Sequence, residues 1–98
     1  MTDDELNEAI HQIVAADEYR TYGRIIYIPD YANDLNASMR EIRGLSPGAH
    51  IELMPTMAQI HRYDGAGGDW SGTVRVEEGD TDPRRLARAL LEALEDGR

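Results

Sequence analysis

Three segments near the middle of the chain alternate apolar and polar residues, and this alternation limits the possible folds more than any other feature. It runs through His50–Met54, Met57–Tyr63 and Thr73–Glu78. A period of two is typical of strands that turn one face to a core and the other to solvent. A fourth strand is expected at Arg24–Ile28, because this β-branched run ends at Pro29. Its two apolar faces place it centrally in the sheet.

Helical patterns lie before and between these segments. Thr2 and Glu5 have the spacing of a capping box, and the first helix should extend to about Tyr19. A second helix should begin after Asp30 or Asn33, whose short polar side chains can cap a first turn. Apolar residues follow each of these starts at the three- and four-residue spacing of one helical face.

A third helical pattern ends the chain. Thr81 or Asp82 can cap it, and Leu86, Leu90 and Leu94 share one face. The order of elements is therefore α-β-α-β-β-β-α. This order predicts a single α+β domain over residues 1–98, built as two layers. One layer is a four-stranded, mostly antiparallel sheet, and the helices form the other layer on one face of that sheet.

The hairpin between the first two alternating segments has a predictable register. Pairing Leu53 with Ala58 places apolar residues opposite one another along both strands. The same register sets His50 opposite His61 on the polar face of the sheet.

The second hairpin is expected to pair Ile60 with Val76, which sets His61 beside Arg75. The polar face then carries a candidate binding surface made of His50, Glu52, His61 and Arg75. Such a face is an ordinary solvated surface, an anion-binding surface or a charge switch near pH 6–7. Two opposed histidines near a carboxylate could bind a metal, but a catalytic metal needs a firm third ligand and an enclosed pocket, and the pattern shows neither, so no metal and no cofactor is expected.

Charge is distributed unevenly along the chain. The net charge is -9, and all ten basic residues are arginines. Residues 1–20 carry six acids and one base, residues 76–98 carry seven acids and four bases, and the central section is nearly balanced. A cluster of arginines, Arg84, Arg85 and Arg88, faces away from the leucines of the last helix. The acidic balance disfavours direct binding to nucleic acid, which requires a basic surface.

Several classes of function are excluded or disfavoured by what the sequence lacks. The chain has no cysteine, so it forms no disulfide and no thiolate site. Its apolar runs are far shorter than the roughly 20 residues that span a bilayer, and a cytoplasmic location without membrane contact is expected. No acid–base pair or nucleophile elbow stands out, so we do not expect an enzyme.

A protein partner with a basic surface fits this charge pattern best. The first hypothesis is an inhibitor, of the kind that phages and mobile elements encode, which blocks a nucleic-acid-binding surface of a host defence complex by charge mimicry. The alternatives are an assembly subunit that dimerises through its sheet face or edge, and a small-ligand or metal sensor that uses the histidine face. Expected partner-binding residues are Asp3, Asp4, Glu5, Glu8, Glu92, Glu95, Asp96, Tyr22, Tyr31 and Trp70.

Overall fold

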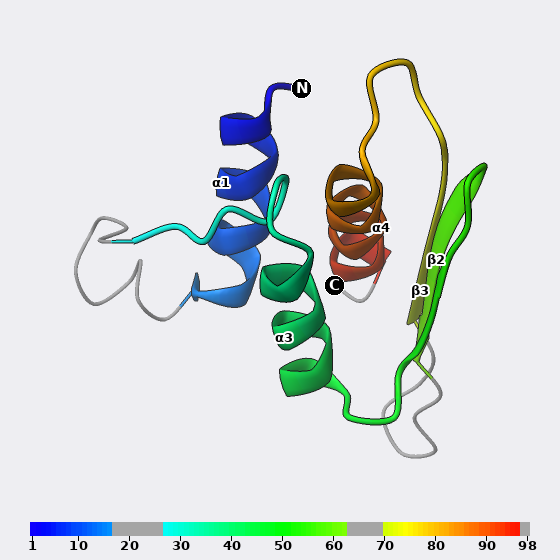
Figure 1. Cartoon of the computed structure of the whole chain (residues 1–98). Coiled ribbons are helices and arrows are strands. Elements are labelled where there is room, and N and C mark those ends of the chain that lie inside the picture. The colour runs from blue at the N-terminus through cyan, green and yellow to red at the C-terminus, as the bar shows by residue number, and fades with distance from the viewer. Residues whose placement is uncertain (17–26, 63–69, 97–98) are drawn as a thin grey trace.

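The protein is an α+β fold of three helices and one antiparallel sheet in the described part of the chain (Figure 1). A computed structural model describes residues 1–16, 27–62 and 70–96. None of the described helices is long and apolar enough to cross a membrane. The elements are α1 (Asp3–Val14), α3 (Leu35–Leu45), β1 (His50–Leu53), β2 (Met57–Arg62), β3 (Trp70–Arg75) and α4 (Asp82–Asp96).

The sheet has three strands in the described residues, in the order β1-β2-β3, rather than the four expected. Of the expected strand Arg24–Ile28, residues 24–26 lie outside the described residues, and Tyr27 and Ile28 have no regular structure. Immediately afterwards the chain turns, because the Tyr31 amide donates to the Pro29 carbonyl at 3.0 Å. A β-branched run favours a strand only where it has neighbouring strands to pack with.

Helix α4 occupies the centre of the molecule and separates the sheet from the other two helices (Figure 1). It packs against β2 and β3 on one side and against α1 and α3 on the other. Three consecutive residues of α4, Arg85–Ala87, are buried together with Ala89, Leu90 and Ala93. A helix covered on one side only would expose one of three consecutive positions. The expected two layers are therefore corrected to three: sheet, α4, and the pair α1 and α3.

The register of the first hairpin confirms the sequence-based prediction. Leu53 lies opposite Ala58, and His50 lies opposite His61. Ala58 and Ile60 of β2 are fully buried on one face of the sheet, and α4 packs against β2. The polar residues of these strands consequently lie on the outer face of the sheet.

The register of the second hairpin differs from the prediction. Ile60 pairs with Gly72 rather than with Val76, and His61 pairs with Ser71 rather than with Arg75. The strand begins at Trp70, earlier than the alternating pattern indicated. The partner of Ile60 differs from the predicted one by four residues, an even number. Side chains of a strand alternate between its two faces, so the same side chains still face the core. Its consequence is that Gly72, which has no side chain, lies directly beneath α4.

The close approach at Gly72 sets how near α4 lies to the sheet. A methyl group added to Gly72 would collide with the Ala89 carbonyl and would lie 2.6 Å from the Ala93 amide nitrogen. Both partners belong to helix backbone, which a rotamer change cannot move aside. Glycine at position 72 and alanine at positions 89 and 93 together allow this contact.

Helix α1 begins as the sequence predicts. The Thr2 hydroxyl accepts from the Glu5 amide at 3.2 Å, and the Glu5 carboxylate accepts from the Thr2 amide at 2.9 Å. These hydrogen bonds hold the pKa of Glu5 below its usual value. The helix ends at Val14, and the expected end near Tyr19 lies outside the described residues.

Helix α3 is capped by Asp34 rather than by Asp30 or Asn33. The Asp34 carboxylate accepts from the Asn36 amide at 3.0 Å. Asp30 instead binds α1, because the Asn7 side chain donates to its carboxylate at 2.9 Å. Asp30, one of the two expected caps, thus connects α1 with the turn that precedes α3.

We predict that Gly72→Ala destabilises the protein by at least about 3 kcal/mol, the upper range for an overpacked core, because α4 must move away from the sheet. Gly44→Ala is the matched control, since Gly44 lies within α3 and an added methyl meets nothing within 4 Å. The control should gain roughly 0.5–1 kcal/mol from its higher helix propensity. Urea denaturation measures both variants, and equal stability of Gly72→Ala and the parent would refute this packing.

Candidate functional site

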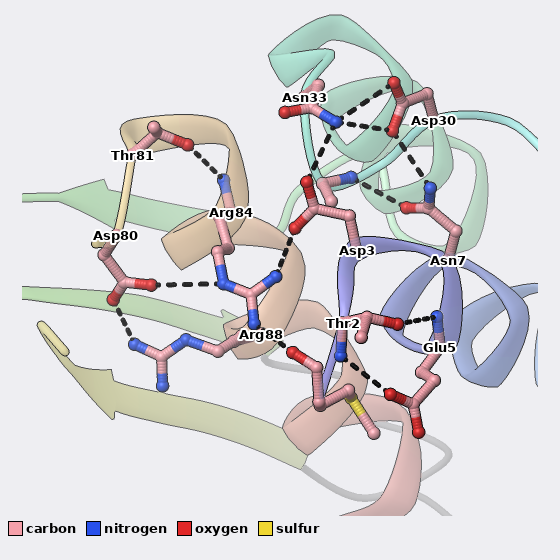
Figure 2. Close-up of polar contacts among 12 residues, drawn as sticks. Thr2, Asp3, Glu5, Asn7, Asp30, Asn33, Asp80, Thr81, Arg84 and Arg88 are labelled. Carbon is pink, nitrogen blue, oxygen red and sulfur yellow. Dashed lines mark hydrogen bonds and ion pairs between the residues drawn. The ribbon is translucent and has the colours of Figure 1, made fainter. Parts of the chain in front are cut away.

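A buried carboxylate lies where the chain enters α4. The side chain of Asp80 is 1% exposed. It accepts a hydrogen bond from the Glu77 amide at 2.9 Å. It also accepts one from the Arg88 guanidinium, and Arg84 Nε lies 3.6 Å from its second oxygen (Figure 2). The sequence did not single out Asp80, because only the tertiary contacts distinguish it from the exposed acids around it.

Arg84 extends this network to the beginning of the chain (Figure 2). Its guanidinium pairs with the Asp3 carboxylate and donates to the Met1 carbonyl at 2.5 Å. Asp3 also accepts from the Asn33 side chain at 3.2 Å. Arg84 and Asp3 therefore connect the start of α4 with the start of α1 and with the turn before α3.

Two opposing effects act on the pKa of Asp80. Burial raises the pKa, because it disfavours the charged form. The hydrogen bond from the Glu77 amide and the charges of Arg88 and Arg84 lower it by more, so the pKa lies below its ordinary value of 3.8. Asp80 therefore stabilises the fold above that pH, and its contribution is lost as pH falls through the folded-state pKa.

The arginines of α4, which the sequence places away from the leucines, are buried or partly buried and paired with acids. Arg85 is 4% exposed and pairs with Asp82 at 2.7 Å. Arg84 and Arg88 are committed to the network around Asp80. These guanidinium groups are thus neutralised by acids of the same chain.

Three of the seven acids predicted to bind a partner have structural roles. Asp3 pairs with Arg84, and Glu5 completes the capping box of α1. The Asp96 carboxylate accepts from the Ser71 amide at 3.1 Å, at the outer edge of β3. We call Asp3, Glu5 and Asp96 the structural acids.

The other four predicted acids are exposed and form no ion pair with the described residues. We call them the free acids. Glu8 accepts a hydrogen bond from Gln12 at 3.3 Å, and the other three have no hydrogen-bond partner in the described part of the chain. Because α1 packs against α4, the free acids lie on two neighbouring helices. The set comprises Asp4, Glu8, Glu92 and Glu95.

An open cleft of about 170 Å³ lies beside two of the free acids. Glu92 and Glu95 line it from α4, together with Arg88, whose charge is already paired with Asp80 and Glu77. The rest of the lining is apolar and comes from the chain start, α1, β3 and α4: Met1, Leu6, Val74 and Leu91. This combination of apolar walls and an acidic rim suits a long basic side chain.

The predicted polar face of the sheet is brought together only in part. His50 lies opposite His61, and its Nε2 atom lies 2.7 Å from the Glu52 carboxylate. Arg75 lies opposite Met57, at the far end of β3 from His61, so it does not join them. Among the described residues there is no group of three or more metal-ligating side chains.

The predicted aromatic contact residues have different positions. Tyr31 is 0% exposed, and its hydroxyl donates to Glu41 at 3.2 Å. Burial and the neighbouring Glu41 carboxylate raise the pKa of Tyr31. The backbone of Trp70 begins β3, whereas its side chain and all of Tyr22 lie outside the described residues. Tyr31 thus belongs to the core rather than to a contact surface.

Comparisons with protein-family models, with curated proteins and with solved structures found no match to this chain. Functional inference therefore depends on the residues themselves. Their main feature is the division of the predicted acids into a structural set and a free set.

We predict that Asp80→Asn lowers the free energy of unfolding by about 3 kcal/mol at neutral pH, because it leaves Arg88 without its buried counter-charge. The variant should also lose less stability than the parent when pH falls below about 4. Denaturant unfolding at several pH values measures both effects.

Glu77→Gln is the matched control, since Glu77 pairs with the same Arg88 at 3.1 Å but its side chain is 65% exposed. Exposed ion pairs contribute roughly 0–1 kcal/mol, so the control should be nearly neutral. Equal losses in the two variants would contradict a special role for burial at Asp80.

Proposed function

We propose that this protein acts by binding another protein, and that its free acids contact a basic surface of that partner. The observation that carries the proposal is that Asp4, Glu8, Glu92 and Glu95 are exposed on two adjacent helices and are not consumed by ion pairs within the described chain. Exposed charges of one sign attract an oppositely charged partner and accelerate association. The arginines of α4 do not cancel this field, because acids of the fold already neutralise them.

The cleft beside Glu92 and Glu95 supplies a specific point of contact. An arginine or lysine of the partner can place its methylene groups against Met1 and Leu91, and its charge then lies beside the two carboxylates. Combined apolar and charged contact provides more affinity than an exposed ion pair alone.

The partner class that we propose is a nucleic-acid-binding protein of a host defence complex. Such a protein binds phosphates with arginine and lysine side chains, and the free acids bind those side chains in place of the phosphates. The chain then acts as an inhibitor, of the kind encoded by phages and mobile elements, in the cytoplasm and without enzymatic chemistry of its own. Covering the basic surface is sufficient to block nucleic-acid binding.

One alternative is favoured by a separate observation. Among the described residues, no side chain bonds the outward backbone groups of Ile51 and Leu53 in β1, whereas Asp96 and Arg88 bond the ends of the β3 edge, and this difference favours assembly with a second copy. The sensor alternative has less support, since Glu52 is the one carboxylate that contacts His50 among the described residues, and Arg75 lies away from both histidines.

We predict that replacing the free acids by amides weakens partner binding without loss of stability. The test captures partners from a lysate of the encoding organism on the immobilised protein and then measures the affinity of the purified partner across a salt series. Affinity should fall steeply as salt rises, because screening acts over about 8 Å at physiological ionic strength. The variant combines Asp4→Asn, Glu8→Gln, Glu92→Gln and Glu95→Gln.

The structural acids provide the control set: Asp3→Asn, Glu5→Gln and Asp96→Asn. This set should lower the melting temperature while leaving the affinity of the folded fraction nearly unchanged. Competition with a labelled DNA duplex then shows whether the bound partner loses its nucleic acid. An affinity that changes neither with salt nor in the free-acid variant would rule out charge mimicry.

A further inference from the structure

The two edges of the sheet are protected differently. On β3, the outward-pointing Ser71 amide donates to Asp96 at 3.1 Å, and the outward-pointing Arg75 carbonyl accepts from Arg88 at 2.6 Å. Side chains of α4 thus close both ends of this edge. An edge whose end groups are already bonded is a poorer template for another strand.

The edge of β1 is open in its central part. Met54 and Met57 exchange two hydrogen bonds, at 2.8 and 3.3 Å, so the backbone groups of Met54, Glu52 and His50 point toward β2. By the same alternation the amides and carbonyls of Ile51 and Leu53 point outward. Among the described residues nothing is bonded to these four groups.

The open edge ends at Ala49. The Ala49 amide donates to the Ser46 carbonyl at 3.0 Å, and the Ala49 carbonyl accepts from Arg43 at 2.8 Å. That carbonyl retains a second lone pair that can accept another hydrogen bond. Pairing with a further strand is therefore available from Ala49 to Leu53.

The inner face of β1 is also incompletely covered. Helix α4 packs against β2 and β3, whereas the side chains of Ile51 and Leu53 on β1 remain only half-buried. One strand thus combines outward backbone groups that have no partner in the described part of the chain with apolar side chains that the fold covers only in part. Both features are removed when another strand is added beside β1.

A second copy of the same strand is complementary to β1 in one register. With Ile51 opposite Ile51 of the other copy, the two residues exchange two hydrogen bonds, and each Leu53 amide reaches the Ala49 carbonyl across the edge. On the outer face, each His50 then lies opposite Glu52 of the other copy. The register shifted by two residues places Glu52 opposite Glu52, which is unfavourable.

The charge distribution also favours a second copy over a basic partner at this edge. The acid-rich sections, residues 1–20 and 76–98, lie outside the section of the chain that forms β1. Near β1 the acid Glu52 lies 2.7 Å from His50 Nε2, and Arg43 lies at the end of the edge. Two β1 edges can therefore meet without bringing the free acids into the contact.

We propose that the protein forms a symmetric dimer in which two β1 strands pair antiparallel about Ile51 and join two three-stranded sheets into one sheet of six strands. This inference is independent of the proposed charge mimicry, because it uses a neutral edge and none of the free acids. The contact is a short one, so the dimer should form in a concentration-dependent manner.

Sedimentation analysis of the full chain at increasing concentration tests the dimer. The mass should rise toward that of two chains at high micromolar concentration, with little dependence on salt. Ile51→Pro removes an outward amide at the open edge while sparing the bonds to β2, and it should abolish the rise in mass. Thr73→Pro removes an outward amide from the closed edge of β3 and should leave dimerisation intact.

Disulfide trapping provides a second readout that does not depend on the proline variants. The chain contains no cysteine, so His50→Cys and Glu52→Cys each introduce a single exposed thiol. In the Ile51-centred register, position 50 of one copy and position 52 of the other are directly opposed, with Cα atoms at about 4.5 Å, within disulfide reach. Identical positions are about 7–8 Å apart, beyond that reach.

A mixture of the two cysteine variants should therefore form several-fold more cross-linked dimer than either variant alone. A chain that stays monomeric at high micromolar concentration would overturn the proposal. Efficient cross-linking of Glu52→Cys with itself would overturn the register about Ile51. If Thr73→Pro abolished the dimer and Ile51→Pro retained it, the interface would lie at the edge of β3, and the proposal for β1 would be overturned.

Discussion

The contact between Gly72 and helix α4 is the constraint on which the rest of the structure depends. The backbone of β3 meets the backbone of α4 at Ala89 and Ala93, with no side chain at position 72 to separate them. This contact fixes α4 over β2 and β3, so that α1 and α3 pack on the opposite side of α4. It also leaves β1 beyond the cover of the helix. The open edge of the sheet and the adjacent acidic helices both follow from this one close approach.

Charge in this protein serves two purposes, and burial separates them. Asp80, Arg84 and Arg88 hold the start of α4 against the sheet and the chain start through partly or fully buried ion pairs. The same helix carries Glu92 and Glu95, which remain exposed beside a small apolar cleft. A count of charges from the sequence makes all of these residues look alike. Only the fold shows which acids are available to a partner and which are required for stability.

Features encoded by neighbouring residues could be predicted from the sequence, whereas features decided by distant contacts could not. The capping box at Thr2 and the pairing of His50 with His61 follow from local spacing and from the strict alternation of a short hairpin. The second hairpin was misplaced because its register is set by the fit of Gly72 under α4, which alternation does not encode. The burial of Tyr31 and Arg85 likewise depends on elements that are far apart in the chain. Tyr27 and Ile28, the described end of the expected strand Arg24–Ile28, are irregular, so β-branched composition alone does not supply a pairing partner there.

The most direct test of this account is a nuclear Overhauser measurement between Gly72 and α4 in the isotope-labelled protein. The account predicts strong cross-peaks from the Gly72 α-protons to the amide proton and methyl group of Ala93, because the backbones meet there without an intervening side chain. It also predicts a Gly72 amide that exchanges slowly with solvent, since Gly72 is buried and pairs with Ile60. Absence of these cross-peaks, together with rapid exchange at Gly72, would contradict the placement of α4 on the sheet and everything inferred from it.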